Sequence, residues 1–372
     1  MAYDIVPYDR GLKEQIADIQ RHLWRGDAGT NIAYLEWKYE RNPFWETPLI
    51  YLAVSDRRVV GMRGMFGSAW EIGAGGETFA IPCADDFVIV PEHRNRGLSS
   101  LIMRTALDDM ARRGHAYLFT LSPGPVTLAT SLIHGWRAVG AMRPVRRRRR
   151  PGLLERGYSR LDQIPLLWRL GDVRSRLAPS RGFFRRLDRL GGRGRAGRSG
   201  EIRVEREPRI GAMAELVRRL GHDGRIRHVR DERYFAWRFQ NPLHEYRFLV
   251  LCDSDGLGGY LVLQVHRREQ SRGVNIVDWE GTTPRIRSEL LRAAVEWGDF
   301  GELSIWTATL SREARELLSE AAFVPAPVRT SLHSPNVLAL STRPGDPDPI
   351  VAGRRLMDIG EWDIRMVYSM AG

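Results

Sequence analysis

The stretch CADDFVIVPEHRNRGLSS, residues 83–100, decides how the rest of the chain is interpreted. Residues Phe87–Val90 are apolar and mostly β-branched, which predicts a short buried strand. Pro91 ends that strand, because proline cannot donate to a sheet ladder. From Leu98 onward the apolar residues recur at helical spacing. The stretch therefore predicts a strand, a basic turn that contains Gly97, and the beginning of a helix.

This arrangement suits the binding of an anion. The first N–H groups of a helix have no partners within the helix, and the helix dipole adds positive potential there. Gly97 lets a ligand approach the backbone closely, and Ser99 and Ser100 bring hydroxyl groups. Arg94 and Arg96 flank the turn with positive charge. A diphosphate would fit such a site, but a capped helix with solvated arginines is an equally open interpretation of the residues alone.

The stretch resembles motif A of the GNAT superfamily of acyl-CoA-dependent N-acyltransferases, whose pattern is Arg/Gln-x-x-Gly-x-Gly/Ala. Here the pattern is Arg94-x-x-Gly97-x-Ser99, with serine in the last position. The expected order of helices and strands over residues 1–145 also resembles that superfamily, as does the ending His134-Gly135-Trp136-Arg137-Ala138-Val139-Gly140. The resemblance implies binding of acetyl-CoA or another acyl-CoA. The implied cofactor-binding residues are Val88, Ile89, Val90, Arg94, Asn95, Arg96, Gly97, Leu98, Ser99 and Ser100.

An internal echo indicates two similar halves. The segment YFAWRFQNP at 234–242 parallels YLEWKYERNP at 34–43, and the expected elements that follow each copy come in matching order. The counterpart of the phosphate turn, Thr282–Ser288, contains no glycine. Chance resemblance of the two segments is the alternative.

We therefore expect an α/β protein, in the α+β sense of a mixed sheet, with two GNAT-like domains that each have a central mixed sheet flanked by helices. The expected divisions are an acyl-CoA-binding domain at 1–145, an arginine-rich linker at 146–200 and a degenerate second domain at 201–372.

The net charge of +12 is concentrated in one segment, because residues 146–199 hold 17 arginines and four acidic residues. Contact of this segment with nucleic acid or an anionic membrane is one interpretation. A connector whose apolar residues pack on the domains is the interpretation we favour. No apolar run approaches the ~20 residues of a membrane span, and the first residues have no signal-like apolar core, so we expect a cytoplasmic protein. The two cysteines, Cys83 and Cys252, lack metal-type spacing, and we expect no metal.

The aspartates at the start of the central strand are the candidate catalytic bases. An amine of pKa ~10 is protonated at neutral pH, so acyl transfer to it requires a base. A carboxylate whose pKa is raised by burial can take that proton. Because neighbours on a strand face opposite ways, only one of Asp85 and Asp86 should face the substrate, and we favour Asp86. A capping or salt-bridged pair is the alternative.

The resemblance implies two further catalytic groups. A backbone N–H at or near Val88 would bind the oxyanion, and the amides of Val88–Val90 would pair with the pantetheine arm. The superfamily uses a tyrosine as the acid for the leaving thiolate, but that position here is Ser131. Tyr117, His134 or water would then replace it, or coenzyme A would leave as the thiolate.

The predicted function is that of an N-acetyltransferase, which moves an acetyl or short acyl group from acyl-CoA to a primary amine of a small molecule or peptide. The second domain would shape the acceptor cleft. Two alternatives stay open. One is a FemX-like aminoacyl transferase that uses charged tRNA, against which the intact turn argues. The other is a non-catalytic protein that senses acyl-CoA, which Ser131 supports.

Overall fold

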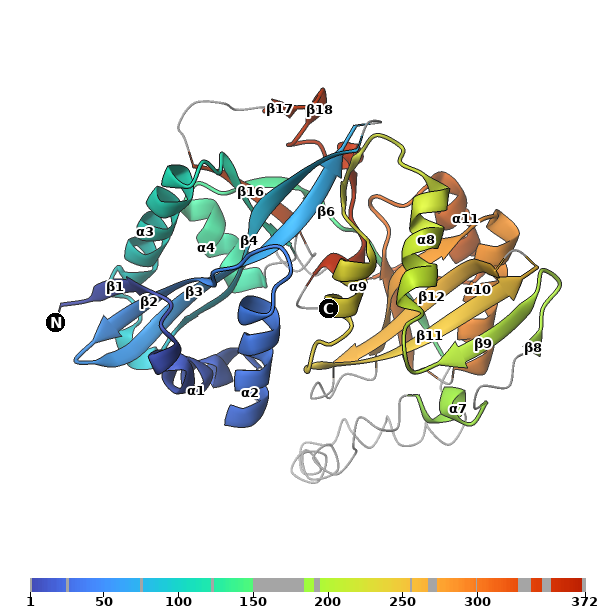
Figure 1. Ribbon diagram of the computed structural model, residues 1–372, viewed down its shortest axis with the longest axis horizontal. Helices are drawn as coiled ribbons and strands as arrows, with labels where there is room; N and C mark the ends of the chain where they lie inside the picture. The colour runs from blue at the N-terminus through green and yellow to red at the C-terminus, as the bar shows by residue number, and fades with distance from the viewer. Residues whose placement is uncertain are drawn as a thin grey trace, which may run out of the picture.

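The computed structural model describes residues 2–24, 27–73, 76–121, 124–149, 184–190, 195–254, 256–266, 273–298, 300–326, 336–342 and 349–369. These residues form two large mixed sheets that lie side by side, each flanked by helices (Figure 1), and a separate two-stranded sheet. The α/β architecture with two similar sheets, which the internal echo predicts, is confirmed.

The first sheet begins as an antiparallel meander of β1 (Asp4–Pro7), β2 (Leu49–Ser55), β3 (Arg58–Ile72) and β4 (Glu77–Ile89). The apolar pattern predicts shorter strands at 59–62 and 66–72 in place of β3, and at 78–81 and 86–90 in place of β4, whereas each is one long strand. Glycines interrupt the apolar pattern of β3, but they lie within the strand. At Gly64 the side chain of Tyr39 packs so close to the strand that only glycine leaves room for it. A Cβ at Gly64 would clash with the hydroxyl of Tyr39.

Helices cover both faces of this sheet (Figure 1). Residues of α1 (Lys13–Trp24) and α2 (Ala28–Leu35) share one core cluster, and residues of α3 (Leu98–Arg112) and α4 (Pro125–Ile133) share another. The remaining elements of this half are η1 (Arg10–Leu12), the π-helical turn η2 (Glu36–Glu40), η3 (Pro91–His93), β5 (Tyr117–Leu121) and β6 (Arg137–Ala141). The α1/α2 face and the α3/α4 face are therefore separate environments on either side of β3 and β4.

The second sheet repeats this pattern with β9 (Glu201–Glu205), β11 (His244–Asp253), β12 (Gly256–His266), β13 (Gly273–Gly281) and β14 (Glu302–Trp306). Its helices are α8 (Ile210–Leu220), α9 (Glu232–Arg238), α10 (Pro284–Trp297) and α11 (Arg312–Glu320). Smaller elements of the chain after residue 148 are α7 (Arg185–Asp188), β8 (Arg195–Ala196), β10 (Ile226–His228), β15 (Val324–Pro325), β17 (Ile350–Val351), β18 (Arg354–Arg355), η7 (Ile359–Glu361), β19 (Trp362–Asp363) and η8 (Met366–Tyr368). Of these, β10 pairs with β3 of the first sheet and with β19.

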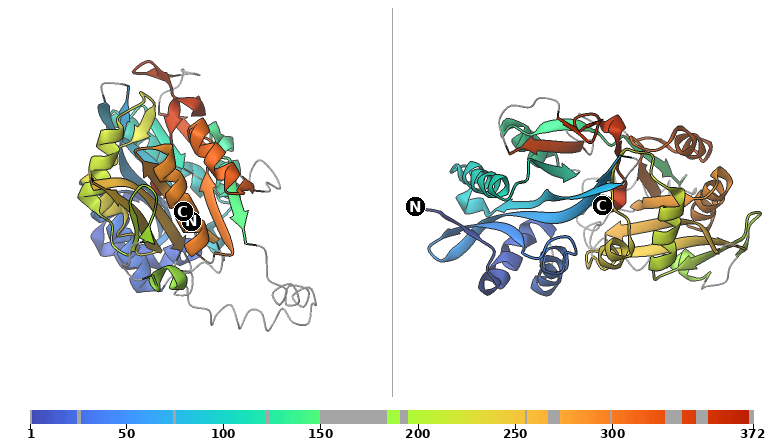
Figure 2. Two further views of the ribbon diagram at one scale, coloured as in Figure 1. Left: turned by 90° about the vertical axis from the view of Figure 1, so that its right-hand side faces the viewer. Right: turned by 45° about the horizontal axis from the view of Figure 1, so that its top comes forward.

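The two sheets exchange strands. After β6, β7 (Pro144–Arg148) leaves the first half and pairs with β14 and β15 of the second sheet. In return, β16 (Asn336–Ser341) inserts between β5 and β6 of the first sheet, where it lies as a red strand among green ones (Figure 2). The division of the chain at residues 145 and 201 stays a prediction for most of each half. The strands β7 and β16 are exceptions, because each pairs in the sheet of the other half.

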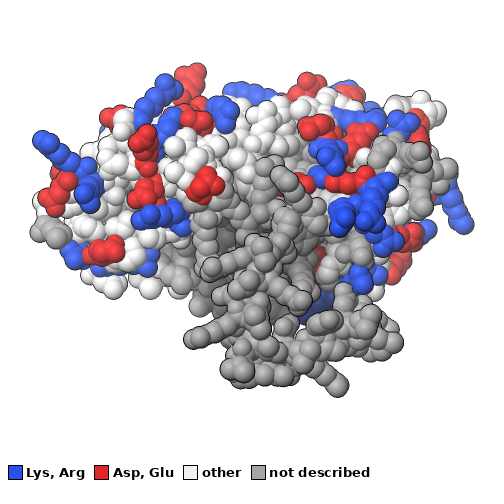
Figure 3. Space-filling view, turned by 90° about the horizontal axis from the view of Figure 1, so that it is seen from below, with Lys and Arg blue, Asp and Glu red and all other residues white. Residues whose placement is uncertain are grey.

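The described parts of the arginine-rich segment pack on the second half. Arg146 and Arg148 of β7 contact Glu302 at 3.3 and 2.6 Å, and Phe184 and Leu187 around α7 are buried in the second core. On the face seen in Figure 3, described basic side chains are interspersed with acidic ones. Residues 150–183 and 191–194 of the segment lie outside the described residues. Contact with nucleic acid or an anionic membrane therefore stays an open interpretation.

Two tryptophans from the echoed segments join the halves. Trp37 and Trp237 stack with ring centroids 4.9 Å apart, and each indole N–H donates to the other's backbone carbonyl at 2.7 Å. The pair is reciprocal, so an approximate two-fold axis relates the two halves at this point. Both side chains are buried, which makes these two hydrogen bonds costly to lose.

Trp37→Phe and Trp237→Phe should destabilise the protein to a similar extent. Each change removes the hydrogen bond that the buried indole donates to the other half and shortens a stacked ring, at a cost of about 1–3 kcal/mol. Urea unfolding of each variant measures the loss. Equal midpoints for the wild-type protein and either variant would contradict this account of the junction.

Candidate functional site

The centre of the candidate site is a β-bulge in β4. The register between β3 and β4 shifts between Arg63 and Gly64, so that Asp86 is an extra residue without its own partner on β3. Asp86 has a φ of 45°, in the left-handed region that costs a residue with a side chain about 1–2 kcal/mol. Backbone strain of this kind concentrates at functional sites.

The bulge brings both predicted aspartates to one cation. Lys38 Nζ lies 2.8 Å from Asp85 Oδ2 and 3.1 Å from Asp86 Oδ2. Strand alternation predicts that only one of the two faces this side, and that expectation is wrong here. The extra residue in the bulge rotates Asp86 onto the α1/α2 face that Asp85 already occupies.

Two tyrosines complete this network from α2 and η2. Tyr39 donates to Asp86 Oδ2 at 2.8 Å, and the Tyr34 hydroxyl accepts from Lys38 Nζ at 2.9 Å. Burial, together with the charges of Asp86 and Asp85, raises the pKa of both phenols well above their ordinary value. Both tyrosines therefore stay protonated and serve as hydrogen-bonding groups. The π-helical turn that carries Lys38 and Tyr39 is itself a feature found often at functional sites.

The two aspartates differ in access to solvent. The Asp86 side chain has no exposed surface, whereas 25% of the Asp85 side chain is exposed. Burial raises the pKa of Asp86, against the opposing effect of Lys38. Asp86 Oδ1 has no hydrogen-bond partner within the described residues. Asp85 is therefore the carboxylate that a molecule arriving from solvent meets first.

The fork between β4 and β5 lies next to the bulge. Among the described residues the two strands pair at Cys83 and Phe119 alone, so no strand pairs with β4 beyond that point, and this side of β4 is called its free edge. The Val90 amide donates to the Val60 carbonyl at 3.0 Å. Antiparallel alternation then turns the Val88 amide toward β3 as well, and turns the amides of Phe87 and Ile89 toward the free edge.

The register narrows the choice of oxyanion donor. The sequence predicts a donor at or near Val88, and the alternation turns the Val88 N–H toward β3. The free-edge amides are those of the residues on either side, Phe87 and Ile89. Which of these three neighbours faces the free edge depends on the strand register, which the sequence does not reveal.

The predicted phosphate turn is open to solvent. Asn95 and Gly97 both have left-handed backbone, with φ of 60° and 73°, so that successive amides form a concave nest. Gly97 is the N-cap of α3, no side chain caps this helix end, and a Cβ on Gly97 would meet nothing within 4 Å. Arg94, Asn95 and Arg96 are exposed, and Arg94 Nε donates to the Ile89 carbonyl at 2.9 Å. The structure therefore brings all the predicted cofactor-binding residues to one end of β4.

A small cavity lies on the α3/α4 face beside this turn. It is lined by Arg63, Phe87, Ser99, Met103, Thr127, Thr130, Ser131, His134 and Trp136. Ser131, where the resemblance places the thiolate acid, is among these residues and is nearly buried. His134 Nδ1 donates to the Thr130 carbonyl at 2.7 Å, and Nε2 lies 2.8 Å from Ser100 Oγ. Tyr117 lies at the start of β5, before the fork.

In the second sheet, the chain itself occupies the corresponding fork. The paired residues of β13 and β14 end at Asn275 and Ser304, and η8 of the C-terminal segment packs against β13. Ile364 donates its amide to Thr309 Oγ1 at 3.0 Å, and that hydroxyl donates to the Ile364 carbonyl at 2.8 Å. The C-terminal segment therefore lies where the free edge of β4 lies in the first sheet.

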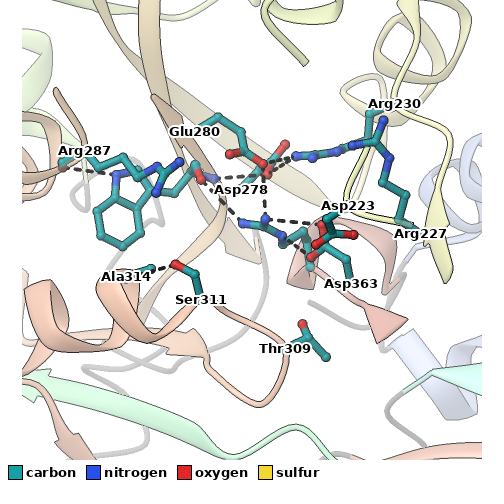
Figure 4. A network of polar contacts seen from close by, with 12 residues as sticks. Asp223, Arg227, Arg230, Asp278, Glu280, Arg287, Thr309, Ser311, Ala314 and Asp363 are labelled. Atoms are coloured by element: carbon teal, nitrogen blue, oxygen red, sulfur yellow. Dashed lines mark hydrogen bonds and ion pairs between the residues drawn. The ribbon is translucent and has the colours of Figure 1, made fainter. Parts of the chain in front are cut away.

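Buried charges hold this segment in place (Figure 4). Arg230 contacts Asp278 at 2.9 Å and Glu280 at 2.8 Å. From the C-terminal segment, Arg365 contacts Asp363 at 2.7 Å and Glu280 at 3.3 Å. Every charge in the group has a partner of opposite sign, as buried charges require.

Asp363→Asn should destabilise the protein in a pH-dependent way. The charges of Arg365 and Arg230 lower the pKa of Asp363 in the folded protein, so its ionised form stabilises the fold above the unfolded pKa of about 3.9. We expect a loss of roughly 3 kcal/mol at pH 7, which shrinks as the pH falls below about 4. Denaturant unfolding at neutral and acidic pH measures the difference. A loss that is independent of pH would contradict the assigned ion pairs.

Comparison with known proteins identifies the first half. Residues 8–128 match a family model described as an acetyltransferase (GNAT) domain. The match covers about a third of the chain, and it concerns that part alone. The bulge, the fork and the open turn all fall within the matched residues. No curated protein sequence matches the chain.

Solved structures extend the likeness in fold over both halves. A GCN5-related N-acetyltransferase from Anabaena variabilis has a TM-score of 0.59 at 11% identity, over 92% of this chain and 73% of that one. A probable N-acyltransferase from Enterococcus faecalis has a TM-score of 0.58 at 11% identity, over the same shares of the two chains. A tandem GNAT protein from the clavulanic acid biosynthesis pathway has a TM-score of 0.52 at 11% identity, over 93% of this chain and all of that one. At this identity the likeness concerns the fold alone.

Sequence reasoning missed Lys38, Tyr39 and Arg63. One signal pointed to the first of these, since Lys38 is one of only two lysines in a chain that otherwise uses arginine. Lys38 also lies in the echoed segment next to Trp37. Arg63 gives no such signal, because arginine is ordinarily an exposed residue. Only the packing of Trp136 and Phe87 against it reveals that it is buried.

Proposed function

We propose that this protein transfers an acetyl or short acyl group from acyl-CoA to a primary amine of a small molecule or peptide. The β-bulge at Asp86 carries the proposal, because it places a carboxylate pair, a free strand edge and an uncapped helix end around one fork. The match to an acetyltransferase domain over the same residues supports it.

The acyl-CoA would bind along the end of β4. The nest at Asn95–Gly97 and the first amides of α3 suit the diphosphate, and Arg94 and Arg96 add positive charge at the exposed turn. The free edge of β4 suits the amide groups of the pantetheine arm, which would pair with Phe87 and Ile89 as an added strand would.

The α1/α2 face would receive the acceptor amine. We assign the base to Asp85 rather than to Asp86, because Asp85 is the accessible member of the pair. Asp86, Lys38 and Tyr39 would hold its carboxylate in place. A free-edge amide, that of Phe87 next to the bulge, would donate to the oxyanion of the tetrahedral intermediate. The second half would support the acceptor site through the Trp37–Trp237 junction, next to Lys38.

Gly97→Asp should weaken the binding of acetyl-CoA at least about tenfold, which corresponds to about 1.4 kcal/mol. The change adds a negative charge in the nest without creating a clash in the fold. Gly114→Asp is the matched control, because Gly114 also has a positive φ, of 84°, and open space around its Cβ at the far end of α3. Isothermal titration with acetyl-CoA compares them. Equal affinity of the two variants would contradict the placement of the diphosphate.

Asp85→Asn should lower kcat/KM by about 10²–10³, the range for loss of a general base. Asp86→Asn should have a smaller effect, because that carboxylate holds Lys38 and does not meet the substrate. Asp108→Asn, on the exposed side of α3, is the control. Thiol release from acetyl-CoA with an amine acceptor measures turnover. If Asp86→Asn is inactive and Asp85→Asn is active, the base is Asp86, as the sequence analysis favours, and the assignment to Asp85 is wrong.

One experiment separates the three classes of function. Titration with acetyl-CoA is combined with thiol release across a panel of sugar amines, amino acids, peptides and aminoglycosides. Binding with turnover supports the proposal. Binding without turnover across the panel favours a sensor of acyl-CoA, and absence of binding favours transfer from charged tRNA.

Location and the need for a metal stay predictions. No helix in the described ranges is both long enough and apolar enough to cross a membrane. Within those ranges no three His, Cys, Asp or Glu side chains gather as metal ligands would. We propose a cytoplasmic enzyme that works on acyl-CoA and an amine without a metal.

A further inference from the structure

Arg63 is a buried cation that the proposed function has not used. Only 3% of the residue is exposed, and its guanidinium lies over the rings of Phe87 and Trp136, at 5.4 and 5.9 Å from the centroids. Its Nε is buried without a hydrogen-bond partner among the described residues. Native proteins rarely leave a buried donor of a charged group unpaired, so this guanidinium requires an explanation.

The surroundings of Arg63 favour an anion. The cavity that it lines also contains the hydroxyl-bearing residues Ser99, Thr127 and Ser131. Ser99 belongs to the first turn of α3, where the helix dipole adds positive potential. No acidic side chain is among the cavity's lining residues in the described part of the chain. A negative group that enters this cavity would therefore meet a cation and hydroxyl donors.

The two faces of the sheet carry opposite charges at the bulge. Arg63 and Gly64 are neighbours on β3 and so point to opposite faces. Gly64 faces Tyr39 and the aspartate pair on the α1/α2 face, whereas Arg63 faces Trp136 on the α3/α4 face. Carboxylates therefore lie on one side of the fork, and a guanidinium lies on the other.

We propose that Arg63 stabilises the sulfur of coenzyme A as it leaves with a negative charge. This inference rests on the proposed function. The amine lone pair forms the C–N bond to the thioester carbonyl carbon, and the proton lost from nitrogen passes to Asp85. The C–S bond breaks with its electron pair on sulfur, and the resulting thiolate is held by the guanidinium. Proton release occurs on the carboxylate face, and negative charge develops on the face of Arg63.

This assignment explains why Ser131 is tolerated where the resemblance places a tyrosine. A serine hydroxyl is too weak an acid to protonate a thiolate. A thiolate that is paired with a guanidinium does not need a proton in order to leave, since the charge pair stabilises the leaving group directly. Arg63 would therefore be a catalytic residue that acts by charge rather than by proton transfer.

The test compares the wild-type protein with Arg63→Met and Arg63→Lys. Arg104→Met, on the exposed side of α3, is the matched control. The first readout is the pKa of the bound coenzyme A thiol, from the ultraviolet absorbance of the thiolate, with desulfo-coenzyme A as the blank. We expect the acid dissociation constant of that thiol to be at least tenfold larger on the wild-type protein and on Arg104→Met than in free coenzyme A. Arg63→Met should abolish this shift, and Arg63→Lys should retain part of it.

Two further readouts accompany the thiol titration. Arg63→Met should still fold, because it fills the space between Phe87 and Trp136 with an apolar chain of similar length, and its melting temperature is measured as the control for folding. It should bind desulfo-coenzyme A normally and turn over at least tenfold more slowly. If Arg63→Met fails to fold, the same comparison is made with Arg63→Lys. A thiol pKa on Arg63→Lys equal to that on the wild-type protein would then count against the proposal.

Three outcomes overturn the inference in distinguishable ways. Equal thiol pKa values in wild-type protein and Arg63→Met, with coenzyme A still bound, refute the role of Arg63 and leave the proposed function standing. A preference for succinyl-CoA over acetyl-CoA that Arg63→Met alone abolishes would assign the cation to an acyl carboxylate instead. Failure of the wild-type protein to bind coenzyme A at all refutes the proposed function, and this inference with it.

Discussion

One extra residue in β4 governs the arrangement of this site. Because Asp86 has no partner on β3, two consecutive carboxylates face the same side, and β4 parts from β5 immediately beyond them. The left-handed backbone of Asp86 is strained, and contacts from Lys38 and Tyr39 hold it there. A regular strand would place Asp85 and Asp86 on opposite faces and would leave no reason for Lys38 to be buried.

The same feature separates charge across the sheet. Lys38 balances the aspartates on the α1/α2 face, while Arg63 stands beside aromatic rings on the α3/α4 face. Acyl transfer from a thioester to an amine moves a proton away from nitrogen and an electron pair onto sulfur. A fork with carboxylates on one side and a guanidinium on the other is organised for that movement, because fixed charges need not reorganise during the reaction.

The second half has the same architecture, but the C-terminal segment of the chain fills the gap between its central strands and stabilises the fold. Its C-terminal segment packs against β13, and buried ion pairs around Arg230 and Arg365 hold the segment there. The halves are also joined by the exchange of β7 and β16 and by the reciprocal Trp37–Trp237 hydrogen bonds. Neither sheet is complete without the other half, so the second half is part of the framework that positions Lys38.

The sequence by itself determined the features that depend on neighbouring residues. The strand, basic turn and helix around Gly97 follow from local spacing, and the two-sheet architecture follows from the echoed segments at 34–43 and 234–242. Only the tertiary structure decided which residues meet at the fork: the bulge that turns Asp86, the register that buries the Val88 amide, the burial of Arg63 and the exchange of strands. These depend on which strands pair and in which register, and contacts between residues far apart in the chain set that choice.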